Sequence, residues 1–98
     1  MSEIIREFYK KNGFPERLIE QKVQSICKYP DIVEEFEEWI RTGTFREDRA
    51  VTIEGYTAKR LSEISAFLNG DGAFTVLKEL RENPEGTLMS IAEGFVWK

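Results

Sequence analysis

Few side chains in this sequence are of the types that perform catalysis or bind metals. The chain contains no histidine, so the commonest general base and transition-metal ligand is missing. Its single cysteine, Cys27, can form neither an intramolecular disulfide nor a multi-thiolate metal site. Because 18 of the 98 residues are acidic, chance pairs of carboxylates are common and do not by themselves indicate acid–base catalysis. We therefore expect no enzyme, no cofactor and no metal site.

Two local features could still carry chemistry, and both have simpler interpretations. The acidic run at residues 34–38 lacks the alternating ligands and the glycine turn of a calcium loop. On a helix its glutamates flank an apolar stripe near the helix start, so we interpret them as a solvated helix face. Cys27 lies near the end of a predicted helix, where the helix dipole disfavours a thiolate. We interpret it as a structural small hydrophobic residue.

Residues 57–81 have the outline of a helix-turn-helix, with two short helices and a glycine-containing turn. Under that interpretation the candidate DNA contacts are Lys59, Arg60, Arg46 and Arg49. However, residues 71–75 at the start of the second helix offer no Arg, Lys, Asn or Gln to read a base edge. The net charge of −4 also disfavours binding to a polyanion. We expect a helical hairpin here, with a DNA-binding regulator as the alternative.

Two aromatic residues close to the end of the sequence are hard to bury fully in a domain of this size. Phe95 and Trp97 follow a predicted helix stop at Gly94, in a chain with 12% aromatic residues. In so small a domain they fold back on the core or form an apolar patch for a partner or a second copy. Folding back is the favoured arrangement, and Phe95 and Trp97 are the candidate interaction residues if it does not occur.

Capping residues and apolar spacing predict the elements that would position these side chains. Expected helix starts are Ser2, Pro15, Pro30, Thr57, Asp71 and Asn83-Pro84, and expected stops are Asn12-Gly13, Thr42-Gly43, Asn69-Gly70 and Gly94. The apolar positions between these signals repeat at helical spacing. They predict a core of Leu18, Val23, Ile26, Phe36, Ile40, Leu61, Ile64, Phe74, Leu77 and Ile91.

The fold predicted from these elements is a single all-α domain of residues 1–98, with five or six short helices packed as hairpins. Two helical halves, 1–43 and 55–98, are joined by an irregular segment, 44–54, which lacks the composition of a flexible tether. Residues 50–53 alternate for only four positions, so they predict at most a short extended piece and no strand pair.

The sequence predicts a cytoplasmic protein. No apolar stretch approaches the length of a membrane span, and acidic residues stand where a signal peptide needs a basic region. We therefore expect no membrane association.

Several segments resemble small uncharacterised bacterial and prophage proteins of about this length. The similarity covers chiefly residues 50–96 and lies in Ile53-Glu54-Gly55-Tyr56-Thr57-Ala58, Gly72-Ala73-Phe74, Leu80-Arg81-Glu82-Asn83-Pro84-Glu85 and Gly94-Phe95. These motifs are caps and turns, and the resemblance implies a small helical accessory protein without assigning any site residue. Together with the missing catalytic groups, it leads us to expect a non-catalytic protein-interaction module with an unidentified protein partner or a second copy.

Overall fold

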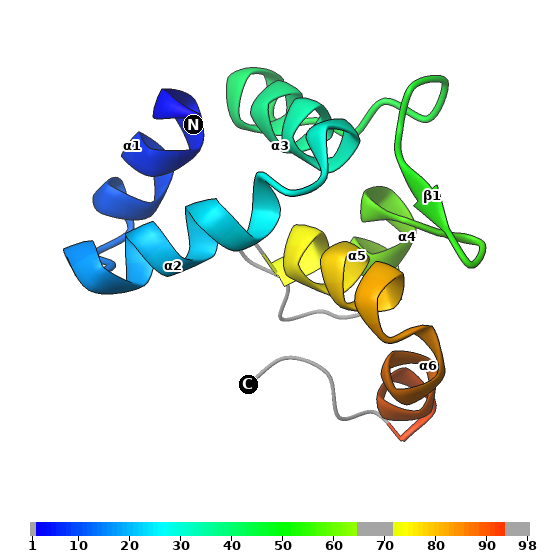
Figure 1. The fold of residues 1–98 in the computed structure, drawn as a ribbon. Coiled ribbons are helices and arrows are strands. Elements are labelled where there is room, and N and C mark those ends of the chain that lie inside the picture. The colour runs from blue at the N-terminus through cyan, green and yellow to red at the C-terminus, as the bar shows by residue number, and fades with distance from the viewer. Residues whose placement is uncertain (1, 65–71, 94–98) are drawn as a thin grey trace. The chain divides into compact units, whose positions relative to one another are not determined.

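The computed structural model describes residues 2–64 and 72–93, which form six α-helices and one short β-hairpin (Figure 1). The elements are α1 (Glu3–Lys11), α2 (Glu16–Ile26), α3 (Pro30–Thr42), β1 (Thr52–Ile53), β2 (Tyr56–Thr57), α4 (Ala58–Ile64), α5 (Gly72–Glu82) and α6 (Pro84–Ala92). This arrangement confirms the predicted all-α class with short helices.

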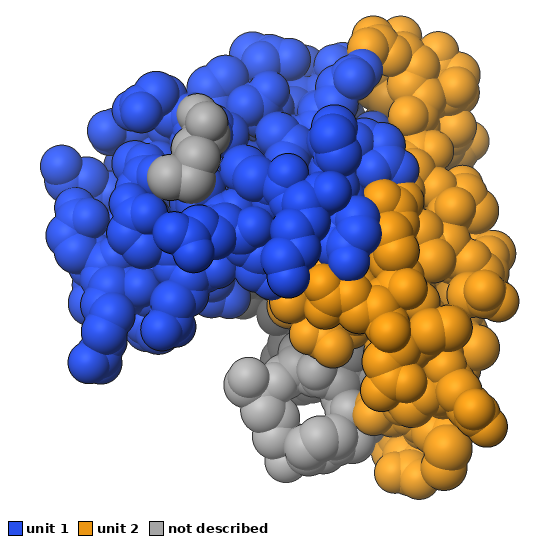
Figure 2. Space-filling view, viewed as in Figure 1, with its two compact units in different colours: residues 1–45 blue, residues 46–98 orange. Residues whose placement is uncertain are grey.

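Contacts within the chain define two compact units, Met1–Phe45 and Arg46–Lys98, which Figure 2 colours blue and orange. The boundary falls inside the segment 44–54 that the sequence predicts as the connection between two halves. In the first unit α1 contacts α2 and α3, and α2 contacts α3. In the second unit α5 contacts α4, α6 and both strands. Each unit therefore consists of helices packed against their neighbours in the chain.

The predicted capping residues set the helix boundaries of the first unit. The Ser2 hydroxyl accepts a hydrogen bond of 3.1 Å from the backbone N–H of Ile5 and so caps α1. Pro30 occupies the first turn of α3, where its missing N–H removes no helical hydrogen bond. Gly43 ends α3 in the left-handed conformation, with φ of 75°. These three predicted signals are confirmed.

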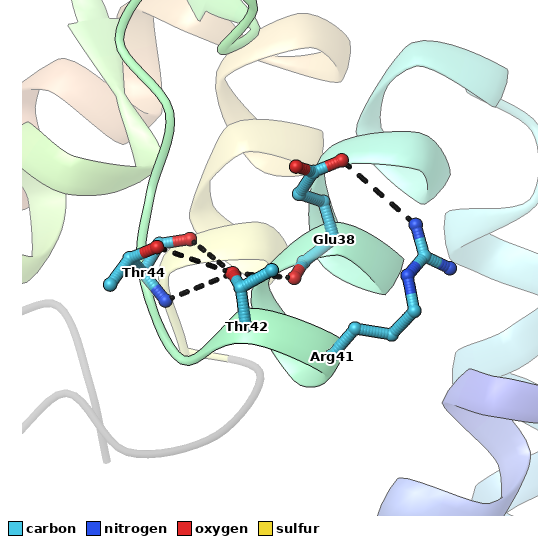
Figure 3. A network of polar contacts seen from close by, with 4 residues as sticks. All are labelled: Glu38, Arg41, Thr42 and Thr44. Atoms are coloured by element: carbon cyan, nitrogen blue, oxygen red, sulfur yellow. Dashed lines mark hydrogen bonds and ion pairs between the residues drawn. The ribbon is translucent and has the colours of Figure 1, made fainter.

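A small polar network closes the end of α3 (Figure 3). The Thr42 hydroxyl donates to the backbone carbonyl of Glu38 at 2.9 Å, and the Thr44 N–H donates to that hydroxyl at 3.2 Å. The Arg41 guanidinium lies 3.9 Å from the Glu38 carboxylate. Through these bonds the Thr42 side chain links the last turn of α3 to the segment that leaves the helix.

The second unit contains a strand pair that the sequence did not predict. Strand β1 runs antiparallel to β2, with Thr52 opposite Thr57. Glu54 and Gly55 connect them with φ of 52° and 82°, and positive values at both positions are typical of a tight hairpin turn. The expectation of no strand pair was wrong because each strand is only two residues long, too short for alternation to be visible. Thr57 caps α4 as predicted, since its hydroxyl accepts from the N–H of Arg60 at 3.0 Å.

Aliphatic and aromatic side chains share the core of the first unit. The buried apolar residues are Ile5, Tyr9, Ile19, Val23, Ile26, Ile32 and Phe36. The ring of Phe8 meets the rings of Tyr9, Phe36 and Trp39 edge to face, with centroids 5.6–5.8 Å apart. Such pairs contribute about 0.5–1.5 kcal/mol beyond their buried area. The contacts tie α1 to α3.

The core of the second unit is supplied mainly by α5. The buried apolar residues are Val51, Ala58, Leu61, Ala73, Phe74, Val76, Leu77 and Leu80. Five of these lie on α5, whereas α6 contributes none. Helix α5 is therefore the centre of this unit, and α6 is a peripheral helix packed beside it.

Four of the predicted core residues lie closer to the surface than expected. Leu18 is 39% exposed and Ile64 is 40% exposed, while Ile40 and Ile91 are half-buried. On α2 the buried residues Ile19, Val23 and Ile26 follow one helical face, and Leu18 is turned away from it by about 100°. For Leu18 the prediction was wrong because two adjacent apolar residues on a helix cannot both point to the centre of one face.

Candidate functional site

The acidic run of α3 is less exposed than a solvated helix face. Glu35 is only 4% exposed, and Glu37 is half-buried with its carboxylate accepting a hydrogen bond of 2.5 Å from the Ser2 hydroxyl. Because α3 buries Ile32, the residue three positions later shares part of the same face. The interpretation as a solvated face was therefore wrong for Glu35. The run contributes to the packing of the first unit.

In the second unit, the start of α6 follows from three residues. The Asn83 side chain accepts a hydrogen bond of 3.3 Å from the N–H of Gly86, and Pro84 occupies the first turn. A Cβ on Gly86 would lie 2.5 Å from the Asn83 side-chain nitrogen, so the glycine gives the cap its space. The predicted start at Asn83-Pro84 is confirmed, and it turns the chain sharply from α5 into α6.

Helix α6 is apolar, yet none of its residues is buried. Its large apolar side chains are Leu88, Met89 and Ile91, of which Met89 is 59% exposed and the other two are half-buried. Isolated exposed apolar residues are normal on protein surfaces. A whole apolar helix without one buried residue is different, because burial of such a face is what normally stabilises a short helix.

Two carboxylates frame the most exposed apolar residue of α6. Glu85 precedes Met89 by four residues and Glu93 follows it by four, so all three lie on the same side of the helix. Both glutamates are exposed, and neither forms an ion pair with any residue that the structure describes. Glu85, Met89, Ala92 and Glu93 thus form an exposed strip of apolar surface with acidic ends, which we call the α6 strip.

The sequence did not identify the α6 strip. It predicted Ile91 as a core residue of this helix, and it placed the candidate interaction residues at Phe95 and Trp97. Both aromatic residues lie outside the described residues, as does the expected stop at Gly94. The apolar positions 88, 89, 91 and 92 span an arc wider than one stripe. That width was the available signal that part of the helix faces solvent.

The four candidate DNA-contact residues lie in α4 and in the turn before the hairpin, and three of them pair with acids. Lys59 forms an ion pair with Glu47, Arg60 lies 3.9 Å from Glu63, and Arg46 lies 3.3 Å from Asp48. The backbone N–H of Arg49 donates to the carbonyl of Arg46 within the turn. The hydrogen bond to the Glu47 carboxylate raises the pKa of Lys59 above its usual value. Neighbouring carboxylates therefore compensate three of these cations.

The second helix of the predicted helix-turn-helix begins with residues that serve the core. Ala73 and Phe74 are buried, and Gly72 and Thr75 are half-buried. The expected cap Asp71 and the stop at Asn69-Gly70 lie outside the described residues. A recognition helix presents its first residues to base edges, and two of those positions are occupied here by buried apolar side chains.

The described part of the chain contains neither a candidate metal site nor a candidate membrane-spanning helix. Among residues 2–64 and 72–93, no three acidic or sulfur ligands come together in a group that could hold a metal ion. No helix in the same ranges is long and apolar enough to cross a membrane. Cys27 is half-buried at the end of α2.

No protein-family model matches the chain, and no curated protein or solved structure shows significant similarity to it. The class of protein that the fold and surface define is a small all-α protein with an exposed apolar helix. The resemblance to small bacterial and prophage proteins stays a prediction.

Proposed function

We propose that this protein is a non-catalytic protein-interaction module and that it binds its partner through α6. The observation that carries the proposal is the exposure of an apolar helix: α6 holds no buried residue, and Met89 is 59% exposed. Methionine is common at binding surfaces because its unbranched side chain adapts to a partner's shape.

The difference in burial between α5 and α6 supports this function. Helix α5 buries five of its eleven residues and forms the core of the second unit. Helix α6 contributes no buried residue, although Leu88, Met89 and Ile91 would each stabilise the fold by about 1.5–3 kcal/mol if fully buried. Covering these side chains with a partner gains part of that free energy on binding.

The alternative is a helix-turn-helix regulator that contacts DNA through Lys59, Arg60, Arg46 and Arg49. The ion pairs of three of these residues reduce the positive potential available to a phosphate backbone. We favour the interaction module for this reason. The alternative predicts sequence-specific DNA recovery that depends on Arg60.

We place the protein in the cytoplasm and group it with the small bacterial and prophage accessory proteins that its caps and turns resemble. The acidic composition and the single cysteine are consistent with a reducing compartment. Cell fractionation with the tagged protein tests the location.

The test of function is capture of partners from a cross-linked lysate of the producing cells, with recovered proteins and DNA both identified. Three forms of the tagged protein are compared: wild type, Met89→Gln and Leu18→Gln. Leu18 is an exposed apolar residue on α2 in the other unit, so its substitution is a matched control. We expect a set of proteins captured by the wild type and by Leu18→Gln, and lost with Met89→Gln.

Two results would overturn the proposal. Protein capture that does not differ between the wild type and Met89→Gln would show that α6 does not bind the partner. Recovery of a reproducible DNA fragment that is lost with Arg60→Ala would support the regulator instead.

A further inference from the structure

We infer that the partner presented to the α6 strip is a basic amphipathic helix, with an apolar residue flanked by Lys or Arg one turn before and one turn after it. The inference rests on the proposed function and specifies its partner. It follows from the charges of the strip, where Glu85 and Glu93 stand on either side of Met89.

The charge distribution of the second unit concentrates uncompensated acid at α6. Residues 46–64 and 72–93 contain eight acidic and six basic residues. Four of the six cations, Arg46, Lys59, Arg60 and Lys78, pair with acids outside α6. Residues 83–93 contain two acids and no base. A partner that covers this helix meets negative charge at both ends of the apolar patch.

The same charges disfavour a second copy of the chain as the occupant. If two α6 helices packed antiparallel across Met89, Glu85 of one copy would face Glu93 of the other at both ends. In a parallel pair each glutamate would face its own counterpart. Either arrangement places like charges opposite each other around an apolar contact. Their repulsion raises the free energy of the dimer, and it is stronger where the contact excludes water. A helix with cations at these positions meets complementary charges instead.

The spacing of the strip can be matched by a partner helix. Glu85, Met89 and Glu93 are spaced one turn apart along one side of α6. A partner helix with Lys, Leu and Lys at positions i, i+4 and i+8 repeats this spacing, so the three contacts form together when the helices run nearly parallel or antiparallel.

The test uses model peptides and the full-length protein. The first peptide carries lysine, leucine and lysine at i, i+4 and i+8, with further leucines at i+1 and i+7 on the same face. The second carries glutamate in place of lysine, and the third has the composition of the first in scrambled order. Binding is measured by titration calorimetry at low salt. We expect the lysine peptide alone to bind, with an affinity that falls as salt rises.

Matched variants separate a specific site from general attraction to an acidic protein. Glu85→Lys combined with Glu93→Lys is expected to weaken binding of the lysine peptide by about tenfold, and Met89→Gln to weaken it as well. Glu7→Lys combined with Glu16→Lys changes the net charge equally on the other unit. We expect that control to retain wild-type affinity within about twofold.

Each of the following outcomes would overturn the inference. Equal weakening by the Glu7 and Glu16 control, or equal binding of the scrambled peptide, would show nonspecific charge attraction. Equal binding of the glutamate peptide would show that the acids play no part. Dimers of the wild type in sedimentation analysis that Met89→Gln abolishes would identify a second copy as the occupant. These outcomes leave the proposed function intact if lysate capture still depends on Met89, whereas capture independent of Met89 refutes the proposed function itself.

Discussion

Replacement of Met89 by glutamine is expected to leave the stability of the protein nearly unchanged. Because Met89 is 59% exposed, folding removes only about two-fifths of its surface from water. Full burial of a methionine contributes about 1.5–3 kcal/mol, so complete loss of this side chain would cost about 0.6–1.2 kcal/mol. Glutamine keeps the first two methylene groups and favours the helix equally well. The expected loss in free energy of unfolding is therefore below about 1 kcal/mol.

The comparison variant is Leu77→Ala in the neighbouring helix α5. Leu77 is fully buried, and truncation of such a residue costs about 2–5 kcal/mol. Both variants and the wild type are unfolded with urea and followed by far-ultraviolet circular dichroism. A loss above about 2 kcal/mol for Met89→Gln would show that the chain itself buries this side chain in solution. The α6 strip would then be part of the core, and the interaction proposal would lose its basis.

Three further predictions test the local structure on which the units depend. Glu47→Gln is expected to lower the pKa of Lys59 towards its ordinary value, because the hydrogen bond to the Glu47 carboxylate raises this pKa. The Lys59 ammonium then loses its proton at lower pH. A nuclear magnetic resonance titration of the side chain detects this change. Ser2→Ala is expected to destabilise the protein by about 1 kcal/mol or more through loss of the α1 cap, and wild-type stability by urea unfolding would refute the cap. Gly55→Ala is expected to cost about 1 kcal/mol because φ is 82° at this position, with Thr52→Ala as a control on the same hairpin; an unchanged unfolding midpoint for Gly55→Ala would contradict the turn geometry.

The helix boundaries could be predicted from the sequence because each depends on neighbouring residues. Ser2, Pro30 and Thr57 act through hydrogen bonds or steric limits within one turn of their own position. Gly43 is similar, since a left-handed residue is needed only where the helix stops. Such signals need no knowledge of the tertiary structure.

Burial was harder to predict because it depends on the width of each helical face and on what covers it. Leu18 and Ile19 have the same apolar character, and only packing against the other helices decides that Ile19 is buried. Glu35 shows the opposite error, since its charge predicts exposure but it lies on the face of α3 that carries the buried Ile32 and Phe36. The candidate site was missed for the same reason. Met89 is as apolar as a core residue and differs only in that no other element covers it. The sequence does not show which elements cover a residue.

If α6 binds the partner as proposed, the second unit keeps the residues that bind apart from those that stabilise the fold. The buried apolar residues of this unit that the structure describes lie on α4, on α5 and at Val51 just before the hairpin, and none lies on α6. We therefore expect substitutions on the outer side of α6 to change binding with little effect on folding, and substitutions on the buried side of α5 to do the reverse. The charges follow the same division. Cations near the hairpin and on α4 and α5 pair with acids from those segments, whereas Glu85 and Glu93 form no ion pair with any described residue. A surface built this way selects partners by charge before apolar contact is made, because electrostatic attraction acts over about 10 Å at moderate salt while apolar contact requires touching surfaces.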